Sequence, residues 1–293
     1  MRRATRRYAN ALTNVAVAYM DLWEAHDYGD PNPGSPAKVE HEKLEDEFGE
    51  EYIDPGGSVI TLTGVYLTTA VDHMRSTAAL FTEKRAGVFS VWVTGRALLE
   101  VCGITYWLLE PTLDPEQRQA RVFTDRLHSL AGAETFIERA NIDVKDVEND
   151  PGTRIAGILE QSKTMTFETG RTGRGVWYVG EPRPSMTALV DDLAYPGTYS
   201  VFSGYSHGEL WALAHQQIPA DIADPTGKDR SFSRAAIGVE EYQALALYLL
   251  QGFVGAVRRF AEHLGWEETQ PFAETAKRAN ADLAKLPQIQ ASK

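Results

Sequence analysis

The chain has a single cysteine, Cys102, among 293 residues. One thiol allows neither an internal disulfide nor a zinc site built from several thiolates, and it fits a reducing cytoplasm. Positive charge is also scarce, because 29 lysines and arginines face 41 acidic residues and the formal net charge is −12. This excess of negative charge disfavours unspecific binding to nucleic acid or anionic lipid. We therefore expect a cytoplasmic protein that binds neither nucleic acid nor membrane.

Long hydrophobic runs without polar residues are absent as well. Four arginines precede a mildly apolar stretch at 8–20, as in a signal peptide, but polar residues interrupt that stretch. Its large apolar residues instead repeat at helical spacing, namely Leu12, Val15, Tyr19 and Leu22. The most apolar segment, 87–110, carries Arg96 and Glu100 at its middle, which disfavours a membrane span. Both segments are predicted to be helices of a folded core.

The composition is that of an average globular protein, with 43% apolar and 24% charged residues, and helical periodicity continues almost throughout. We predict an all-α fold, a single multi-helix bundle over 1–293. It comprises an N-terminal helix with an acidic segment (1–57), a core bundle (58–265) and a C-terminal helix (266–293). The helix at 87–110 is apolar on nearly all faces and is expected at the centre. Further helices are expected near 4–27, 58–84, 114–140, 142–163, 185–194, 197–217, 232–265 and 271–286.

The exception to the helical pattern is a Gly/Arg-rich loop at 168–185, in which VWYV indicates a short strand or hairpin. An acidic segment at 38–54 also stands out, since it holds eight acids. It is either a site for a metal or a cationic partner, or a solvated helix face. The second interpretation is favoured, because the glycine pattern of a calcium loop is missing. Zinc-protease, di-iron and nucleotide-binding motifs are also missing, so we predict neither metal nor cofactor.

Arg96 and Glu100 lie four residues apart in the apolar helix at 87–110. A buried charge is costly unless it is paired, so these two residues form either a structural ion pair or part of a functional site. In the second case Arg96 would hold an anionic group and Glu100 would carry a proton. His73, in the middle of the preceding helix, is either a core residue or a member of the same site.

A polar stripe follows the helix predicted at 197–217, where Tyr199, Ser203, His207 and Trp211 recur every four residues. Ser203 and His207 lie one turn apart, which is the beginning of a nucleophile–base pair. The G-x-S-x-G elbow of a Ser/His hydrolase is absent around Ser203, so that activity is disfavoured. His207 remains a candidate for a polar site.

Arg258 and His263 have the R-x4-H spacing of the catalytic motif in the HEPN superfamily, which includes metal-independent ribonucleases. An Arg/His pair can polarise a phosphate and move a proton. The motif is short, however, and it lies near a predicted helix end, where basic residues are favoured by the helix dipole. The acidic composition also argues against RNA as a partner.

Four strings, RALLEVCGITYWLLEP, EQRQAR, RPSMTALV and YSVFSGYSHGELWAL, resemble a poorly characterised group of actinobacterial all-helical proteins. This group is distantly similar to HEPN-like and abortive-infection-type helical domains. The resemblance covers roughly residues 60–260 and implies a helical fold without an established activity. The positions that it highlights are Arg96, Glu100, Arg118, Arg121, Tyr199, Ser203 and His207.

These observations predict a small-molecule-binding protein with an internal pocket walled by the helices at 58–84, 87–110 and 197–217. The acid/base candidates are His207, Glu100 and Arg96, acting on an anionic or carbonyl-containing ligand. The predicted ligand-binding residues are Tyr199, Ser203, Trp211, His73, Trp107 and Arg174, the last in a lid formed by 168–185. Two alternatives are a HEPN-like ribonuclease and a non-catalytic structural or interaction protein. The apolar final helices also favour a homodimer.

Overall fold

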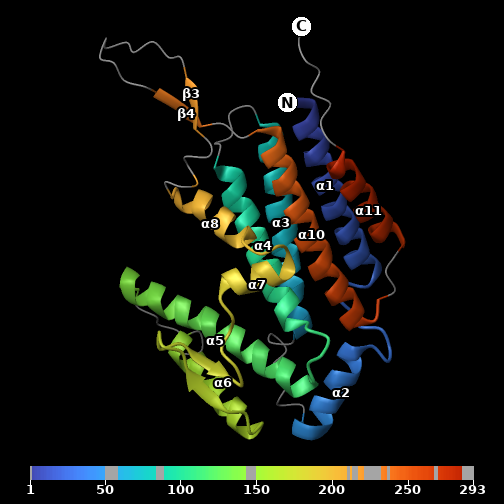
Figure 1. Ribbon diagram of the computed structural model, residues 1–293. Coiled ribbons are helices and arrows are strands. Elements are labelled where there is room, and N and C mark those ends of the chain that lie inside the picture. Colours follow the sequence, from blue (N-terminus) through green and yellow to red (C-terminus); the bar gives the residue numbers. More distant parts are fainter. Residues whose placement is uncertain are drawn as a thin grey trace.

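The computed structural model describes residues 2–49, 59–83, 89–142, 150–209, 212, 217–220, 232–235, 238–266 and 270–285. Within these ranges the chain forms ten helices and two small antiparallel sheets of two strands each (Figure 1). The predicted all-α multi-helix bundle is therefore confirmed. The helices are α1 (Arg2–Ala25), α2 (Pro36–Phe48), α3 (Val59–Thr82), α4 (Ser90–Leu108), α5 (Pro115–Ala140), α6 (Pro151–Thr164), α7 (Met186–Leu193), α8 (Thr198–His207), α10 (Val239–Leu264) and α11 (Gln270–Ala284).

The amphipathic pattern of the N-terminal segment produces α1 as predicted. Leu12, Val15 and Tyr19 have no exposed surface, and Leu22 is 2% exposed. These residues recur at intervals of three and four, so they form one stripe along the helix. The stripe faces α3, α10 and α11, and α1 thereby joins the main core of the bundle.

The apolar helix α4 lies at the centre of the fold, where it contacts α3, α5, α7, α8 and α10. Two glycines allow this crowding. A Cβ at Gly95 would lie 2.8 Å from Cε1 of Phe202 on α8, and one at Gly103 would lie 3.2 Å from the Leu189 backbone on α7. The missing side chains therefore let α8 and α7 cross α4 closely. Gly95 is also adjacent to Arg96, so this contact brings α8 against the polar part of α4.

A second, smaller core lies under α5, α6 and the hairpin of β1 (Thr169–Arg171) and β2 (Trp177–Val179). This hairpin confirms the strand predicted within 168–185. The start of α5 follows from a capping box, in which the Asp114 side chain accepts a bond from the Gln117 N–H and the Gln117 side chain accepts one from the Asp114 N–H. The hairpin lies beside α5 and α6 in the lower part of Figure 1, whereas α8 lies higher in the view.

Some sequence-based boundaries were wrong. The helix predicted at 197–217 ends at His207, because Gly208 adopts φ +67 and forms a left-handed C-cap. Residues 217–220 form β3 (Gln217–Ala220), which pairs with β4 (Phe232–Ala235), so the helix predicted from 232 begins only at Val239. The segment predicted at 142–163, with an interruption at 149–152, forms α6 from Pro151 with Asp150 as its N-cap, whereas residues 143–149 lie outside the described part.

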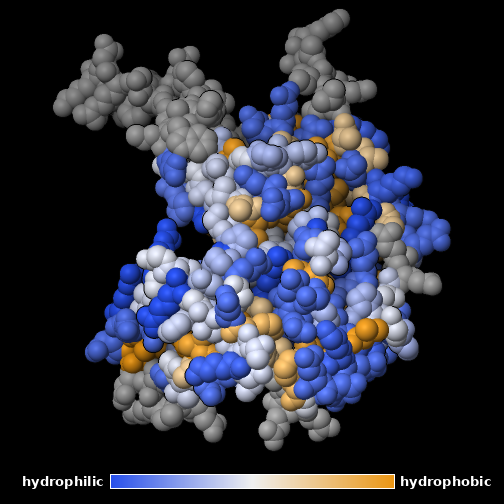
Figure 2. Space-filling model, turned by 60° about the horizontal axis from the view of Figure 1, so that its bottom comes forward, coloured by the Kyte–Doolittle hydropathy of each residue, from blue (hydrophilic) through white to orange (hydrophobic). Residues whose placement is uncertain are grey.

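The face shown in Figure 2 is mostly hydrophilic, and its apolar areas are small and separated. Among the described helices, α10 is long and apolar enough to cross a membrane. Of its most apolar stretch, 56% is buried within the fold. A core helix of a soluble bundle has the same properties, so this finding does not distinguish the two settings.

Candidate functional site

Four of the predicted site residues meet on one side of the bundle, where α8 crosses α4. Arg96 and Glu100 come from consecutive turns of α4, and Tyr199 and His207 come from the two ends of α8. We call these four residues the Arg96 cluster. Because α4 and α8 are about a hundred positions apart in sequence, it is their packing that brings the two pairs together, through Gly95 against Phe202 and through Trp92 against Phe202 and Tyr205.

Each nitrogen of the Arg96 guanidinium has a different partner. Nε donates to Glu100 Oε1 at 2.7 Å, and Nη2 donates to the Tyr199 hydroxyl at 2.7 Å. The Tyr199 hydroxyl in turn donates to the same Glu100 Oε1 at 3.0 Å, which closes a triangle of hydrogen bonds. Nη1 lies 2.6 Å from Nε2 of His207.

The contact with Arg96 determines the protonation pattern of His207. An arginine has only hydrogen-bond donors, so His207 Nε2 must accept. The imidazole is therefore neutral in this arrangement and carries its proton on Nδ1. Among the described residues, His207 Nδ1 and Glu100 Oε2 have no hydrogen-bond partner. Within the described part of the chain, the imidazole thus retains an open donor at Nδ1 and the carboxylate an open acceptor at Oε2.

The Arg96 cluster lies at the edge of the fold. The side chains of Arg96 and Glu100 are 21% and 27% exposed, and His207 is exposed. Burial lowers the pKa of Arg96, but its bonds to Glu100 and Tyr199 outweigh this effect and leave the pKa raised. Partial burial and the Glu100 carboxylate raise the pKa of Tyr199. These residues are thus more exposed than the predicted internal pocket would require, and His207 most of all.

The remaining predicted ligand-binding residues do not join the Arg96 cluster. Ser203 is half-buried and makes no hydrogen bond with another described residue, and His207 Nε2 is already engaged by Arg96. The nucleophile–base pair is therefore not formed. Trp107 is eleven residues along α4 from Arg96, about 16 Å away, and packs with Leu108 and Leu189 in a separate core. Trp211 lies outside the described residues.

Two further candidates lie elsewhere. His73 is half-buried on α3, and no described hydrogen bond joins its side chain to the Arg96 cluster. Arg174 is exposed between β1 and β2, in the hairpin that packs on α5. The lid predicted from this loop therefore does not cover the Arg96 cluster. Within the described part of the chain, no group of three or more His, Cys, Asp or Glu side chains is arranged to hold a metal ion.

The R-x4-H pair lies on α10 with its two members in different environments. Arg258 is exposed, whereas His263 is 5% exposed and packed inside the bundle. Five residues of an α-helix correspond to a rotation of about 140° from one face toward the other. The two side chains consequently do not face one groove within this chain.

Two buried ionic networks were not predicted. Asp125 of α5 is 1% exposed and accepts from Arg183 at 2.7 Å and from the Tyr66 hydroxyl at 2.5 Å. Arg118, 4% exposed, donates to both oxygens of Glu40 and to the carbonyl of Leu108. Asp125 was not conspicuous in the sequence, because α5 carries many other polar and charged residues. Of the second network, the resemblance had highlighted only Arg118. Both networks connect helices of the bundle to its second core.

The fold and the Arg96 cluster define an all-α multi-helix bundle with a partly exposed polar site. No protein-family model matches the chain, and no curated protein or solved structure shows significant similarity to it. The relationship to HEPN-like proteins therefore stays a prediction.

Proposed function

We propose that this protein binds a small polar molecule at the Arg96 cluster. One observation carries the proposal. The acceptor Glu100 Oε2 and the donor His207 Nδ1 have no hydrogen-bond partner among the described residues, and both lie beside a guanidinium whose three nitrogens each already have one. Arg96 is already paired with Glu100, and a ligand at Glu100 Oε2 meets the negative charge of that carboxylate, so a neutral ligand that donates a hydrogen bond fits better than an anion. The ligand class that fits is a carbonyl next to an N–H or O–H, as in a primary amide or a protonated carboxylic acid.

The bonds within the Arg96 cluster hold its two ligand-facing groups in place. Arg96 restrains the His207 ring from its Nε2 side, which directs the Nδ1 proton away from the guanidinium. Tyr199 and Arg96 together restrain Glu100 through Oε1. A carboxylate and a neutral imidazole held in this way can also accept and donate a proton, so acid/base chemistry on the bound carbonyl compound is the associated activity. The alternative of a ribonuclease at Arg258 and His263 receives no support from their placement on α10.

The experiment is a two-dimensional NMR titration with acetamide and benzamide as neutral probes and benzoate as the anionic comparison. We expect benzamide to shift the imidazole resonances of His207 and the backbone amides around Glu100. The substitutions Glu100→Gln and His207→Phe should each weaken binding at least tenfold, which is about 1.4 kcal/mol. Ser200→Ala, on an exposed position of α8, is the matched control and should leave binding unchanged.

Thermal unfolding of the same variants separates binding from a purely structural ion pair. Because Arg96 and Glu100 are partly exposed, we expect Glu100→Gln to cost no more than about 1 kcal/mol of folding free energy. A large loss of stability with no shift at His207 from any probe would show that the Arg96 cluster only clamps α4 to α8, and would overturn the proposal.

A further inference from the structure

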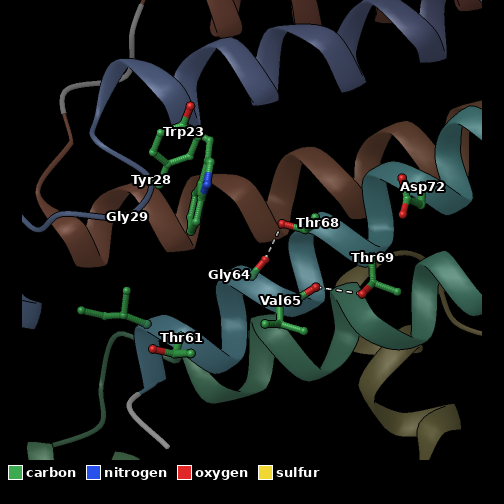
Figure 3. Close-up of a pocket in the computed structure, with 10 residues that line it drawn as sticks. Trp23, Tyr28, Gly29, Thr61, Gly64, Val65, Thr68, Thr69 and Asp72 are labelled. Carbon is green, nitrogen blue, oxygen red and sulfur yellow. Dashed lines mark hydrogen bonds between the residues drawn. The ribbon is translucent and has the colours of Figure 1, made fainter. Parts of the chain in front are cut away.

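A groove of about 480 Å³ lies between the end of α1 and the outer face of α3, and contains no member of the Arg96 cluster (Figure 3). Its volume lies within the range that small-molecule sites occupy. Aromatic residues lie at one end in the figure and an aspartate at the other. The residues that line it are Trp23, Tyr28, Gly29, Ile60, Thr61, Gly64, Val65, Thr68, Thr69 and Asp72.

The indole of Trp23 is locked in place at the aromatic end. A Cβ at Gly64 would lie 2.7 Å from its Cη2 atom, and one at Gly29 would lie 3.0 Å from the same atom. The edge of the indole therefore lies against both glycines, and neither position has room for a side chain. The ring also stacks on Phe260 with centroids 5.6 Å apart. This part of the groove is consequently rigid and preformed.

Tyr28 lies over this end in a strained backbone conformation. Its φ is +60 and that of the preceding Asp27 is +46, so two consecutive residues with side chains are left-handed. This conformation costs roughly 1–2 kcal/mol per residue. Tyr28 is nevertheless 64% exposed, so burial of its ring offsets little of this backbone strain. A bulky aromatic residue that is strained and exposed beside a cavity indicates a ligand contact.

The other end of the groove offers hydrogen-bond acceptors. The hydroxyl protons of Thr68 and Thr69 are donated to the carbonyls of Gly64 and Val65, at 2.9 and 2.8 Å, which leaves their oxygens free to accept. Asp72 is exposed and forms no hydrogen bond or ion pair with another described residue. The ten lining residues include no lysine, arginine or histidine. The side chains at this end therefore complement a cation.

We propose that the groove binds an amphiphilic organic amine. Its aromatic or alkyl body would lie against the rings of Trp23 and Tyr28. Its ammonium group would donate to Asp72 and to the oxygens of Thr68 and Thr69. Asp72 follows Gly64 by eight positions, which corresponds to about 12 Å along α3 and sets the separation of the two ends. The net charge of −12 would favour the approach of such a cation.

The test uses three probes that share one body and differ in charge, namely 4-phenylbutylamine, 4-phenylbutan-1-ol and 4-phenylbutyrate. Calorimetric titration of the full chain should rank the amine first, the alcohol at least tenfold weaker and the carboxylate weakest. Asp72→Asn should remove the preference for the amine and leave the alcohol unchanged. Tyr28→Gly should weaken the amine and the alcohol alike. Asp192→Asn, at an exposed acid of α7, matches the change in net charge and should have no effect.

Equal affinities for the three probes, no binding of any of them, or the same loss in Asp72→Asn and Asp192→Asn would overturn this proposal. Asp72 is an exposed residue without described partners, so Asp72→Asn should unfold at the same temperature as the unsubstituted chain. The outcome is independent of the Arg96 cluster, since the groove and the cluster share no residue.

Discussion

The buried histidine of α10 should make the fold sensitive to mild acid. His263 is 5% exposed, and its Nε2 has no hydrogen-bond partner among the described residues. The nearest carboxylate oxygen, Glu40 Oε2, is 3.9 Å away and is itself bound by Arg118. Burial of the imidazole, and secondarily the charge of Arg118, lower the pKa of His263 from 6.5 to about 3.

Whether acid stabilises or destabilises the fold depends on whether the folded or the unfolded chain binds the His263 proton first. The folded pKa of His263 lies below the unfolded value, so the unfolded chain takes up the proton first as the pH falls. The stability associated with the neutral ring is complete above pH 6.5 and is lost progressively from there toward pH 3. At about 1.4 kcal/mol per pH unit, this group alone removes about 2 kcal/mol between pH 6.0 and 4.5. Burial raises the pKa of Glu40, so the folded chain binds that proton first and Glu40 adds stability as the pH falls, opposite to the effect of His263.

The assay compares urea unfolding at pH 6.0 and 4.5 in the unsubstituted chain and in His263→Gln. Glu40 is present in both proteins, so the difference between their pH dependences isolates the histidine. We expect the variant to lose about 2 kcal/mol less over this interval. The control is His41→Gln on α2, where the side chain is 44% exposed, and it should retain the full loss. Identical pH dependences of the unsubstituted chain and His263→Gln would refute the reasoning.

Three further substitutions test the packing by their effect on the urea midpoint. Arg118→Met should cost about 3–5 kcal/mol, because it leaves the mostly buried Glu40 without its partner. The double variant with Glu40→Gln should recover part of this loss, and no recovery would contradict the role of the unpaired carboxylate. Gly64→Ala should cost about 1–3 kcal/mol, because the added Cβ meets the Trp23 ring at 2.7 Å, and an unchanged midpoint would show that the ring is free to move. Asp114→Ala should cost about 1 kcal/mol through loss of the capping box, whereas Asp114→Asn should cost less because the amide oxygen can still accept.

The elements governed by local rules were predictable from the sequence. The spacing of Leu12, Val15 and Tyr19 determined both the existence of α1 and the face that it buries, because an α-helix repeats every 3.6 residues. The start of α5 followed from Asp114 and the proline after it. Helical geometry alone also places Arg258 and His263 about 140° apart around α10, so their different orientations could have been predicted from the spacing.

Identifying members of the Arg96 cluster from the sequence was possible for a similar reason. Arg96 and Glu100 are charged residues in an otherwise apolar helix, and Tyr199 and His207 repeat along one stripe. Such positions are conspicuous because charge in an apolar helix is costly unless paired. That the two pairs meet was only an expectation until the crossing of α4 and α8 was known.

The tertiary structure alone decided three features. It placed the Arg96 cluster at an edge, because α8 ends at Gly208 and leaves His207 exposed. It paired Asp125 with Arg183, which are 58 positions apart. It also formed the groove, which depends on the close approach of Trp23 to Gly64 on another helix. Each of these features arises where two segments distant in sequence come into contact, and local periodicity carries no information on which segments will meet.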